Sequence, residues 1–218
     1  MKWPILVVAI AGLAQAQTMN MEEIAKALGV RCDYCHSAAR GSGEEEPKKE
    51  IARAMMAMTH DLNAKIQEAT GKPPNETTRV ECVTCHRGVA IPQSLSAIIL
   101  RTVAEKGGAA AVEQYRDLRN QYYSRATYDF SEDALLEMVQ RVIQGRPDDA
   151  IALLRMNLEF NPQSAKTYAL IGFAYTRKLD DASAIANLQK SLELDPTNGV
   201  VRGRLEQLQE YARRRRQQ

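Results

Sequence analysis

The sequence contains few histidines and few aromatic residues. Of its 218 residues only three are histidine, and phenylalanine, tryptophan and tyrosine together make up 6%. That aromatic content is low for a core built from side chains alone, so a bound apolar group would be a natural supplement to the core of at least one part of the chain.

The chain also lacks a strong net charge and a long internal apolar run. Its formal charge is +2, and it falls close to zero once Lys2 is removed with the N-terminal segment, which gives no reason to expect a nucleic-acid partner. Beyond that segment no stretch approaches the roughly 20 apolar residues that a membrane helix needs. We therefore expect no transmembrane segment in the mature chain.

The N-terminal segment, residues 1–16, has the pattern of a secretory signal peptide. A short charged start is followed by the apolar run Trp3–Leu13 and by the small-x-small site Ala14-Gln15-Ala16. Roughly 7–15 apolar residues suit such a segment. An uncleaved membrane anchor is the alternative, and the lack of a cysteine at the cleavage point excludes a lipid anchor there. A mature protein that begins near Gln17 and is periplasmic, or otherwise exported, is predicted.

All four cysteines lie in two identical patterns. These are Cys32-Asp33-Tyr34-Cys35-His36 and Cys82-Val83-Thr84-Cys85-His86, which also use two of the three histidines. Each pattern is the attachment signature of a c-type haem, in which two thiols form thioethers to the porphyrin and the adjacent imidazole binds iron. The sequence predicts two covalently attached haem c groups, held by Cys32, Cys35, Cys82 and Cys85, with His36 and His86 as iron ligands.

Other cysteine chemistry explains less of the pattern. A zinc site would place its two cysteine pairs roughly 15–20 residues apart, whereas fifty positions separate Cys32 from Cys82. Two short disulfides or thioredoxin-like pairs suit an exported protein. Neither accounts for a histidine directly after both pairs.

The scarcity of histidine limits the sixth ligand of each iron. Only His60 remains after the two motifs, so two bis-histidine haems within one chain are excluded. Methionine is the usual alternative, and Met/His ligation raises the reduction potential.

A short helix is expected just before the first motif. Met21 shares an apolar face with the residues three, four and seven positions further on, and Gly29 is a natural helix stop. Met21 therefore lies on the buried face, while Met19 points elsewhere and lies almost at the mature terminus.

A longer helix is expected from about Pro47 to Ala69. His60 lies roughly 100–140° around this helix from Met55, away from the apolar stripe. From the residues alone, the choice between Met55 and Met58 as a ligand stays open. The stripe consists of Ile51, Met55, Met58, Leu62 and Ile66.

The segment from Met21 to Pro92 resembles half of the tetrahaem cytochrome subunit of photosynthetic reaction centres. The similarity is carried by Leu28–His36, by Ala52–Met58 and by Val83–Gly88, and it closes with Pro92. It covers about a third of the chain. Only two haem motifs are present, so a direct role in photosynthesis is not implied.

The resemblance implies which methionines bind iron. In that family a helix precedes each haem motif and supplies an axial methionine, which by position is Met21 for the first haem and Met55 for the second. His60 falls where the family needs no ligand. The insert Thr70–Thr78 departs from the family pattern, because it lengthens the link between the methionine helix and the second motif.

The C-terminal half contains a repeat. Residues 150–162 recur as residues 184–196, with a period that resembles tetratricopeptide repeats. The second unit has Gly172 and Tyr175 at the expected positions, whereas the first is degenerate. Because two repeats are few for independent stability, flanking helices over about Ala109–Ser124 and Val200–Arg216 are expected to complete the stack.

Together these features predict an all-α protein made of a haem-cored multihaem cytochrome c domain and an α-helical, tetratricopeptide-like (TPR-like) repeat domain. The predicted limits are 1–16 for the signal peptide, 17–105 for the dihaem domain and 106–218 for the repeats. The repeats would dock another protein or a second copy in a homo-oligomer, or only pack against the haem domain.

The predicted function is one-electron transfer between a redox protein donor and acceptor, without catalysis. Two other classes remain. One is a peroxidase-like enzyme or gas sensor with one open iron, where His60 or a nearby acid would handle protons. The other is a repeat scaffold protein in which the haems are secondary.

Overall fold

A computed structural model describes residues 20–36 and 47–216. Every regular element in these ranges is helical, which confirms the predicted all-α class. The chain divides into two compact units, Met1–Ala90 and Ile91–Gln218. The predicted signal peptide and Met19 lie outside the described residues.

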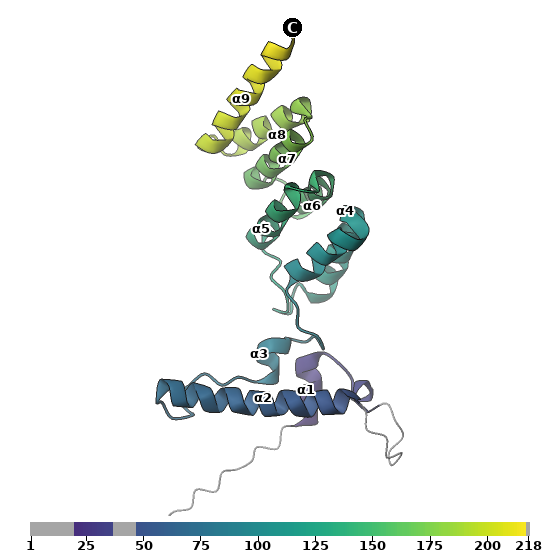
Figure 1. Ribbon diagram of the computed structural model, residues 1–218, viewed down its shortest axis with the longest axis vertical. Coiled ribbons are helices and arrows are strands. Elements are labelled where there is room, and N and C mark those ends of the chain that lie inside the picture. Colours follow the sequence, from purple (N-terminus) through teal and green to yellow (C-terminus); the bar gives the residue numbers. More distant parts are fainter. Residues whose placement is uncertain (1–19, 37–46, 217–218) are drawn as a thin grey trace, which may run out of the picture. The chain divides into compact units, whose positions relative to one another are not determined.

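The first unit contains the two cysteine motifs, and its two longer helices match those expected from the sequence (Figure 1). Asn20 caps the first helix by accepting the backbone N–H of Glu22 at 3.0 Å, as a short polar side chain does at an N-cap. Gly29 ends it in the left-handed conformation, with φ of 64°. The elements are α1 (Met21–Leu28), the 3-10 turn η1 (Cys32–Tyr34), α2 (Pro47–Thr70) and α3 (Cys82–His86).

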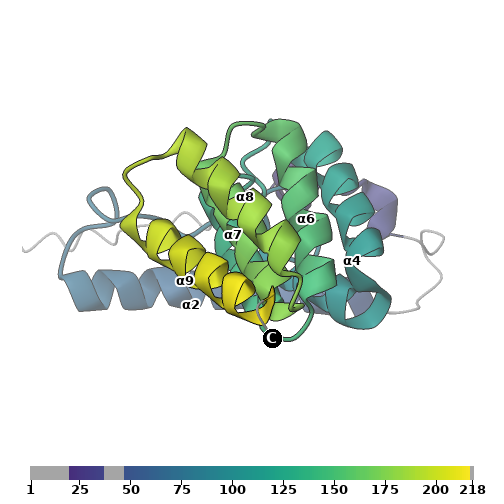
Figure 2. The same ribbon diagram turned by 90° about the horizontal axis from the view of Figure 1, so that it is seen from above.

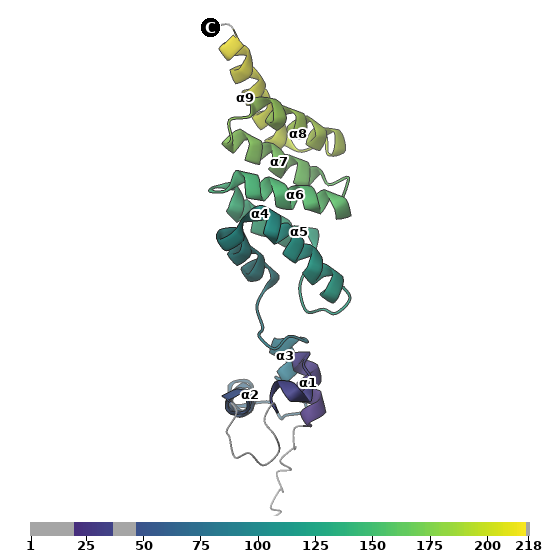
Figure 3. The same cartoon turned by 90° about the vertical axis from the view of Figure 1, so that its right-hand side faces the viewer.

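The second unit is a stack of helices that follow one another in chain order (Figure 3). The first of them bends at Gly107, whose φ of 84° interrupts the helical path. The N–H of Gly108 donates to Asp149 Oδ1 at 2.7 Å, which fixes the bend against α6. The helices are α4 (Leu95–Tyr122), α5 (Glu132–Ile143), α6 (Pro147–Phe160), α7 (Ala165–Arg177), α8 (Asp181–Leu194) and α9 (Gly199–Arg216).

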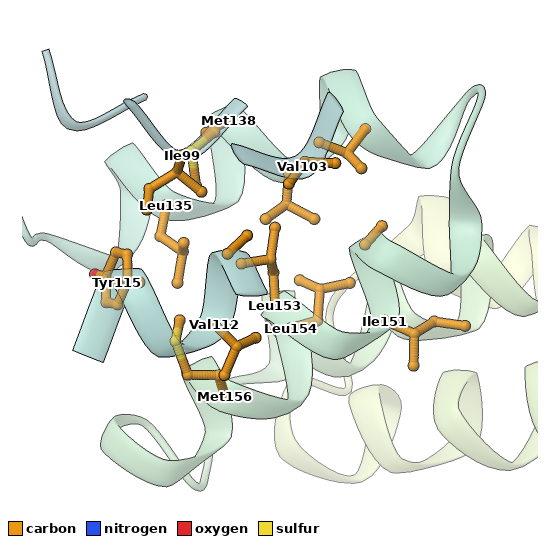
Figure 4. Close-up of a cluster of buried hydrophobic side chains, with 14 of the residues drawn as sticks. Ile99, Val103, Val112, Tyr115, Leu135, Met138, Ile151, Leu153, Leu154 and Met156 are labelled. Carbon is orange, nitrogen blue, oxygen red and sulfur yellow. The ribbon is translucent and has the colours of Figure 1, made fainter. Parts of the chain in front are cut away.

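Apolar side chains from α4, α5 and α6 build the core of this unit (Figure 4). Ile99 and Val103 belong to it, so the first half of α4 packs with the second unit although the sequence had placed residues up to 105 with the haems. The functional domain limits stay a prediction. The largest fully buried side chains of this core are Tyr115, Ile99, Leu153, Leu154, Met156 and Val139.

The period of the sequence repeat reappears in the helices. Helix α8 is as long as α6 and follows it at the same interval that separates the start of α9 from the start of α7. A Cβ on Gly172 would lie 2.7 Å from the Leu188 side chain, so glycine lets α7 approach α8. Helices α4 and α9 flank the pairs as expected, with α9 packed against α8 (Figure 2). The TPR-like assignment stays a prediction.

None of the helices within the described residues is both long enough and apolar enough to cross a membrane.

Candidate haem sites

The second cysteine motif forms a helix of its own. Helix α3 begins at Cys82 and ends at His86, so the cysteines at i and i+3 lie on the same side of one helical turn. Glu81 caps this turn: its backbone N–H donates to Thr84 Oγ1 at 3.0 Å, in a reciprocal capping box. Two thiols on one side of a capped turn match two attachment points along one porphyrin edge.

The imidazole of His86 is buried and oriented. Its exposed fraction is 9%, and its Nδ1 lies 3.0 Å from the carbonyl oxygen of Val89. Because a carbonyl oxygen only accepts hydrogen bonds, Nδ1 is the protonated nitrogen of the neutral ring. The lone pair on Nε2 is therefore available for a metal, and the carbonyl of Val89 fixes the ring as outer partners do for ligating histidines.

The chain turns back sharply after His86. Arg87 and Gly88 both have left-handed backbones, with φ of 48° and 86°. The N–H of Gly88 then donates to the carbonyl oxygen of Ala27 at 2.8 Å. A Cβ on Gly29 would lie 2.0 Å from the Gly88 oxygen, so only glycine permits this approach of the end of α1 to the end of the second motif.

The first motif is a tighter turn. Cys32 O accepts the backbone N–H groups of Cys35 at 3.3 Å and His36 at 3.0 Å. The His36 side chain is exposed. By position, the counterpart of Val89 in the first motif is Ala39, which lies outside the described residues.

A cation–π contact joins this motif to the start of α2. Lys48 Nζ lies 3.8 Å from the ring centroid of Tyr34, the residue just before the second thiol of this motif. The contact connects the first motif to the helix that carries the second predicted methionine ligand.

The predicted methionine ligands lie on α1 and α2. Met21 is the first residue of α1 and is 57% exposed, so the expected burial of its side chain is not observed. On α2, Met55 is half-buried and Met58 is 44% exposed, while His60 is exposed and lies elsewhere on the helix surface. The assignment of Met21 and Met55 as ligands stays a prediction.

Helix α2 has an apolar face without a side-chain core beneath it. None of its 24 residues is buried, although Ile51 and Leu62 lie on that face with exposed fractions of 62% and 39%. A flat apolar group held by two thiols and one imidazole fits such a face and such a donor set. The residues of the first unit therefore fit a c-type haem.

All four cysteines lie within the described residues, and none of them is in a disulfide. Within residues 20–36 and 47–216, no three histidine, cysteine or acidic side chains gather into a metal-binding group.

The contact made by the side chain of Asn63 was not predicted from the sequence. Its side chain bonds both backbone groups of Val80, two residues before Cys82: Val80 N–H donates to Oδ1 at 2.8 Å, and Nδ2 donates to Val80 O at 2.9 Å. The two residues are 17 positions apart, and no periodic pattern connects them. An asparagine on a polar helix side carries no signal for such a contact.

Helical elements that present two Cys-x-x-Cys-His motifs are typical of a c-type cytochrome. The chain belongs to the family of the photosynthetic reaction centre cytochrome C subunit, whose model matches residues 13–173. That match extends well beyond the resemblance expected from residues 21–92. Membership of this cytochrome family agrees with the covalently bound c-type haem expected from the two motifs.

A curated relative agrees with this family. Cytochrome c-554 of Chloroflexus aurantiacus is 34% identical to the chain over 79 residues. The matched region makes up 35% of this chain and 19% of the relative, so the chain spans only about a fifth of that protein's length.

Proposed function

We propose that the protein is an exported dihaem c-type cytochrome that carries single electrons between a donor and an acceptor protein. The observation that carries this proposal is the second motif. There, both thiols lie on one capped turn, and the adjacent His86 has Nδ1 bound to Val89 O at 3.0 Å. The first motif repeats the same residue types at the same spacing.

Each chain segment has a defined role in this proposal. Cys32 and Cys35 tether one haem and Cys82 and Cys85 the other, while His36 and His86 supply a nitrogen ligand to each iron. When bound, each haem supplies a one-electron ferric/ferrous couple. Met21 and Met55 are proposed to close the sixth positions, so that neither iron binds substrate.

The surroundings of the motifs favour electron exchange rather than catalysis. The thioether of methionine is a soft ligand that raises the potential relative to a second imidazole. Cys32 and Cys85 are exposed. His60, the group that an open-site enzyme would use, is exposed and away from the apolar face of α2.

The remaining parts of the chain complete the proposal. Residues 1–16 would direct export and be removed, which places haem attachment outside the cytoplasm. The helical stack of the second unit would dock a redox partner or a second copy through a TPR-like surface.

The test is a haem count on the purified mature protein together with its reduced spectrum with and without carbon monoxide. We expect two haems and no carbon monoxide response. Met55→Ala should make one of the two haems bind carbon monoxide, whereas Met58→Ala, on the same helix face, should leave the spectrum unchanged.

The same experiment separates the alternatives. A carbon monoxide response in the unaltered protein would reveal an open iron and favour the peroxidase-like or gas-sensor class. Loss of electron transfer in Met55→Ala supports the carrier. Unchanged function in that variant, with partner capture intact, would favour the scaffold class.

A further inference from the structure

We propose that Asn63 is a positioning residue that sets α2 in register with the second haem motif and so holds Met55 opposite His86. This inference rests on the proposed function, because it assumes that Met55 and His86 bind the same iron. Asn63 does not touch either ligand and acts only through the backbone of Val80.

The contact uses both ends of one amide. Oδ1 of Asn63 accepts from Val80 N–H at 2.8 Å, and Nδ2 donates to Val80 O at 2.9 Å. These two hydrogen bonds resemble those between paired residues of two β-strands, except that a side chain takes the place of one strand. Among side chains of this length only asparagine offers a donor and an acceptor together, because an ionised aspartate accepts only and leucine does neither.

The amide is itself held on the helix. Nδ2 of Asn63 also donates to the carbonyl oxygen of Thr59 at 3.0 Å. One turn earlier, Thr59 Oγ1 donates to the carbonyl oxygen of Met55 at 2.8 Å. Side-chain-to-backbone hydrogen bonds therefore link successive turns of α2, from the carbonyl of Met55 to Thr59 and from the carbonyl of Thr59 to Asn63, whose amide also binds the backbone of Val80.

Val80 is adjacent to the residues that start the second motif. Glu81 follows it as the N-cap of α3, and Cys82 is the first residue of that helix. A contact at Val80 thus fixes where the helical turn with both thiols begins. The same helix, α2, carries Met55 two turns before Asn63, which is about 12 Å along the helix axis at about 1.5 Å per residue.

The position of this contact explains how the chain tolerates its insert. Residues Thr70–Thr78 lengthen the connection between α2 and the second motif, and a long flexible connection would leave the motif poorly placed relative to Met55. Asn63 and Val80 lie on either side of that insert and close it into a loop. The register of the motif then depends on the amide contact and not on the length of the insert.

The test compares Asn63→Asp and Asn63→Leu with Asn75→Asp in the holoprotein. Asn75 is an exposed residue of the insert and serves as the matched control. The measurements are the haem count, the long-wavelength charge-transfer band of ferric Met–His haem, carbon monoxide binding, and hydrogen exchange of the Val80 amide.

At neutral pH both Asn63 variants should keep two attached haems and lose about half of the Met–His band. One haem should then bind carbon monoxide, and the Val80 amide should exchange faster. In Asn63→Asp, acidification toward the ordinary aspartate pKa of about 3.9 gives a carboxyl that both donates and accepts. The band should return there, while Asn63→Leu stays unchanged.

Each other outcome overturns the inference. An unaltered band and unaltered carbon monoxide response in both Asn63 variants would show that Met55 needs no such positioning. Loss of the second haem from both variants would show a role in folding alone. If the unaltered protein lacks two Met–His haems, the ligand assignment itself fails, and this is seen before any variant is made.

Discussion

The two units of the chain differ in how their interiors are made. In the second unit, side chains such as Leu153, Leu154 and Val139 have no exposed surface at all. In the described part of the first unit, Ala27 and His86 are the buried residues. No residue of the long helix α2 is buried. One unit has a side-chain core, and the other presents apolar faces around two cysteine motifs.

The two units therefore obtain their stability from different sources. Burial of apolar side chains is the main favourable contribution to folding, and the second unit has it within its own sequence. The described residues of the first unit supply few such contacts. They supply instead the thiols and imidazoles that are proposed to hold a large apolar group, so we infer that haem attachment and folding of this unit are coupled.

The largest effect is expected when both haems are prevented from attaching. A chain with all four cysteines replaced by serine, produced without haem attachment, should lose amide protection over residues 47–90. Residues 95–216 should keep theirs, because their core needs no cofactor. Hydrogen exchange with mass spectrometry measures both units in one sample. Full protection of α2 in the haem-free chain would contradict the inferred coupling.

The second prediction concerns a core substitution in the second unit. Leu153→Ala removes a side chain with 0% exposure from its core and should lower the free energy of unfolding of that unit by about 2–5 kcal/mol. The haem spectrum and the potentials should stay as they are. Leu62→Ala on α2, where the side chain is 39% exposed, is the control and should leave the unfolding of the second unit unchanged.

In the first unit, alanine substitutions at two glycines distinguish the cost of a left-handed backbone from the cost of a steric clash. Gly29 and Gly71 have nearly the same left-handed φ, 64° and 63°. A Cβ on Gly71 would meet nothing within 4 Å, whereas one on Gly29 would lie 2.0 Å from Gly88 O. Gly71→Ala should therefore cost about 1–2 kcal/mol from the left-handed backbone alone.

Gly29→Ala should cost about 1–3 kcal/mol more than Gly71→Ala, because α1 must move away from the second motif. Thermal unfolding followed by haem absorbance gives both values. Equal costs would show that the contact between Gly29 and Gly88 contributes nothing to the first unit.

Much of the fold could be predicted from the sequence. The helix that ends before Gly29, the long helix that starts at Pro47 and the flanking helices of the repeats are confirmed. These features follow local rules of periodicity, capping and motif spacing. The roles of the cysteines and histidines depend on spacing too, and they stay predictions together with Met21 and Met55.

What the sequence did not reveal depends on contacts between distant residues. Asn63 with Val80 and Gly29 with Gly88 are pairs that no period links, and each is visible only when the chain is folded. The first half of α4 is a similar case. Its apolar residues follow the haem motifs directly, yet Leu95 and Ile99 pack against α5 and α6, because those helices offer an apolar surface to cover.

The smallest effect concerns Tyr115, a residue of the second core with 2% exposure, whose ring packs edge-on against Phe130 at 5.6 Å. Burial raises the pKa of the Tyr115 phenol, and the nearby Arg119 offsets part of this rise.

A raised pKa means that the folded state keeps a proton which the unfolded chain releases near the ordinary value of about 10. The resulting stabilisation is complete below that pH and is lost as the pH rises through the folded-state value. Tyr115→Phe should therefore show a shallower alkaline loss of stability than the unaltered chain, whereas Tyr211→Phe, at an exposed ring of α9, should match it.

Denaturant unfolding of the haem-free chain between neutral pH and pH about 11 isolates this effect, because only the second unit is expected to be folded there. Burial also raises the pKa of Tyr128, so part of the alkaline slope should remain in Tyr115→Phe. An unchanged slope would mean that the phenol of Tyr115 ionises as easily in the folded core as in the unfolded chain. Even this side-chain core would then be more accessible to water than its packing indicates.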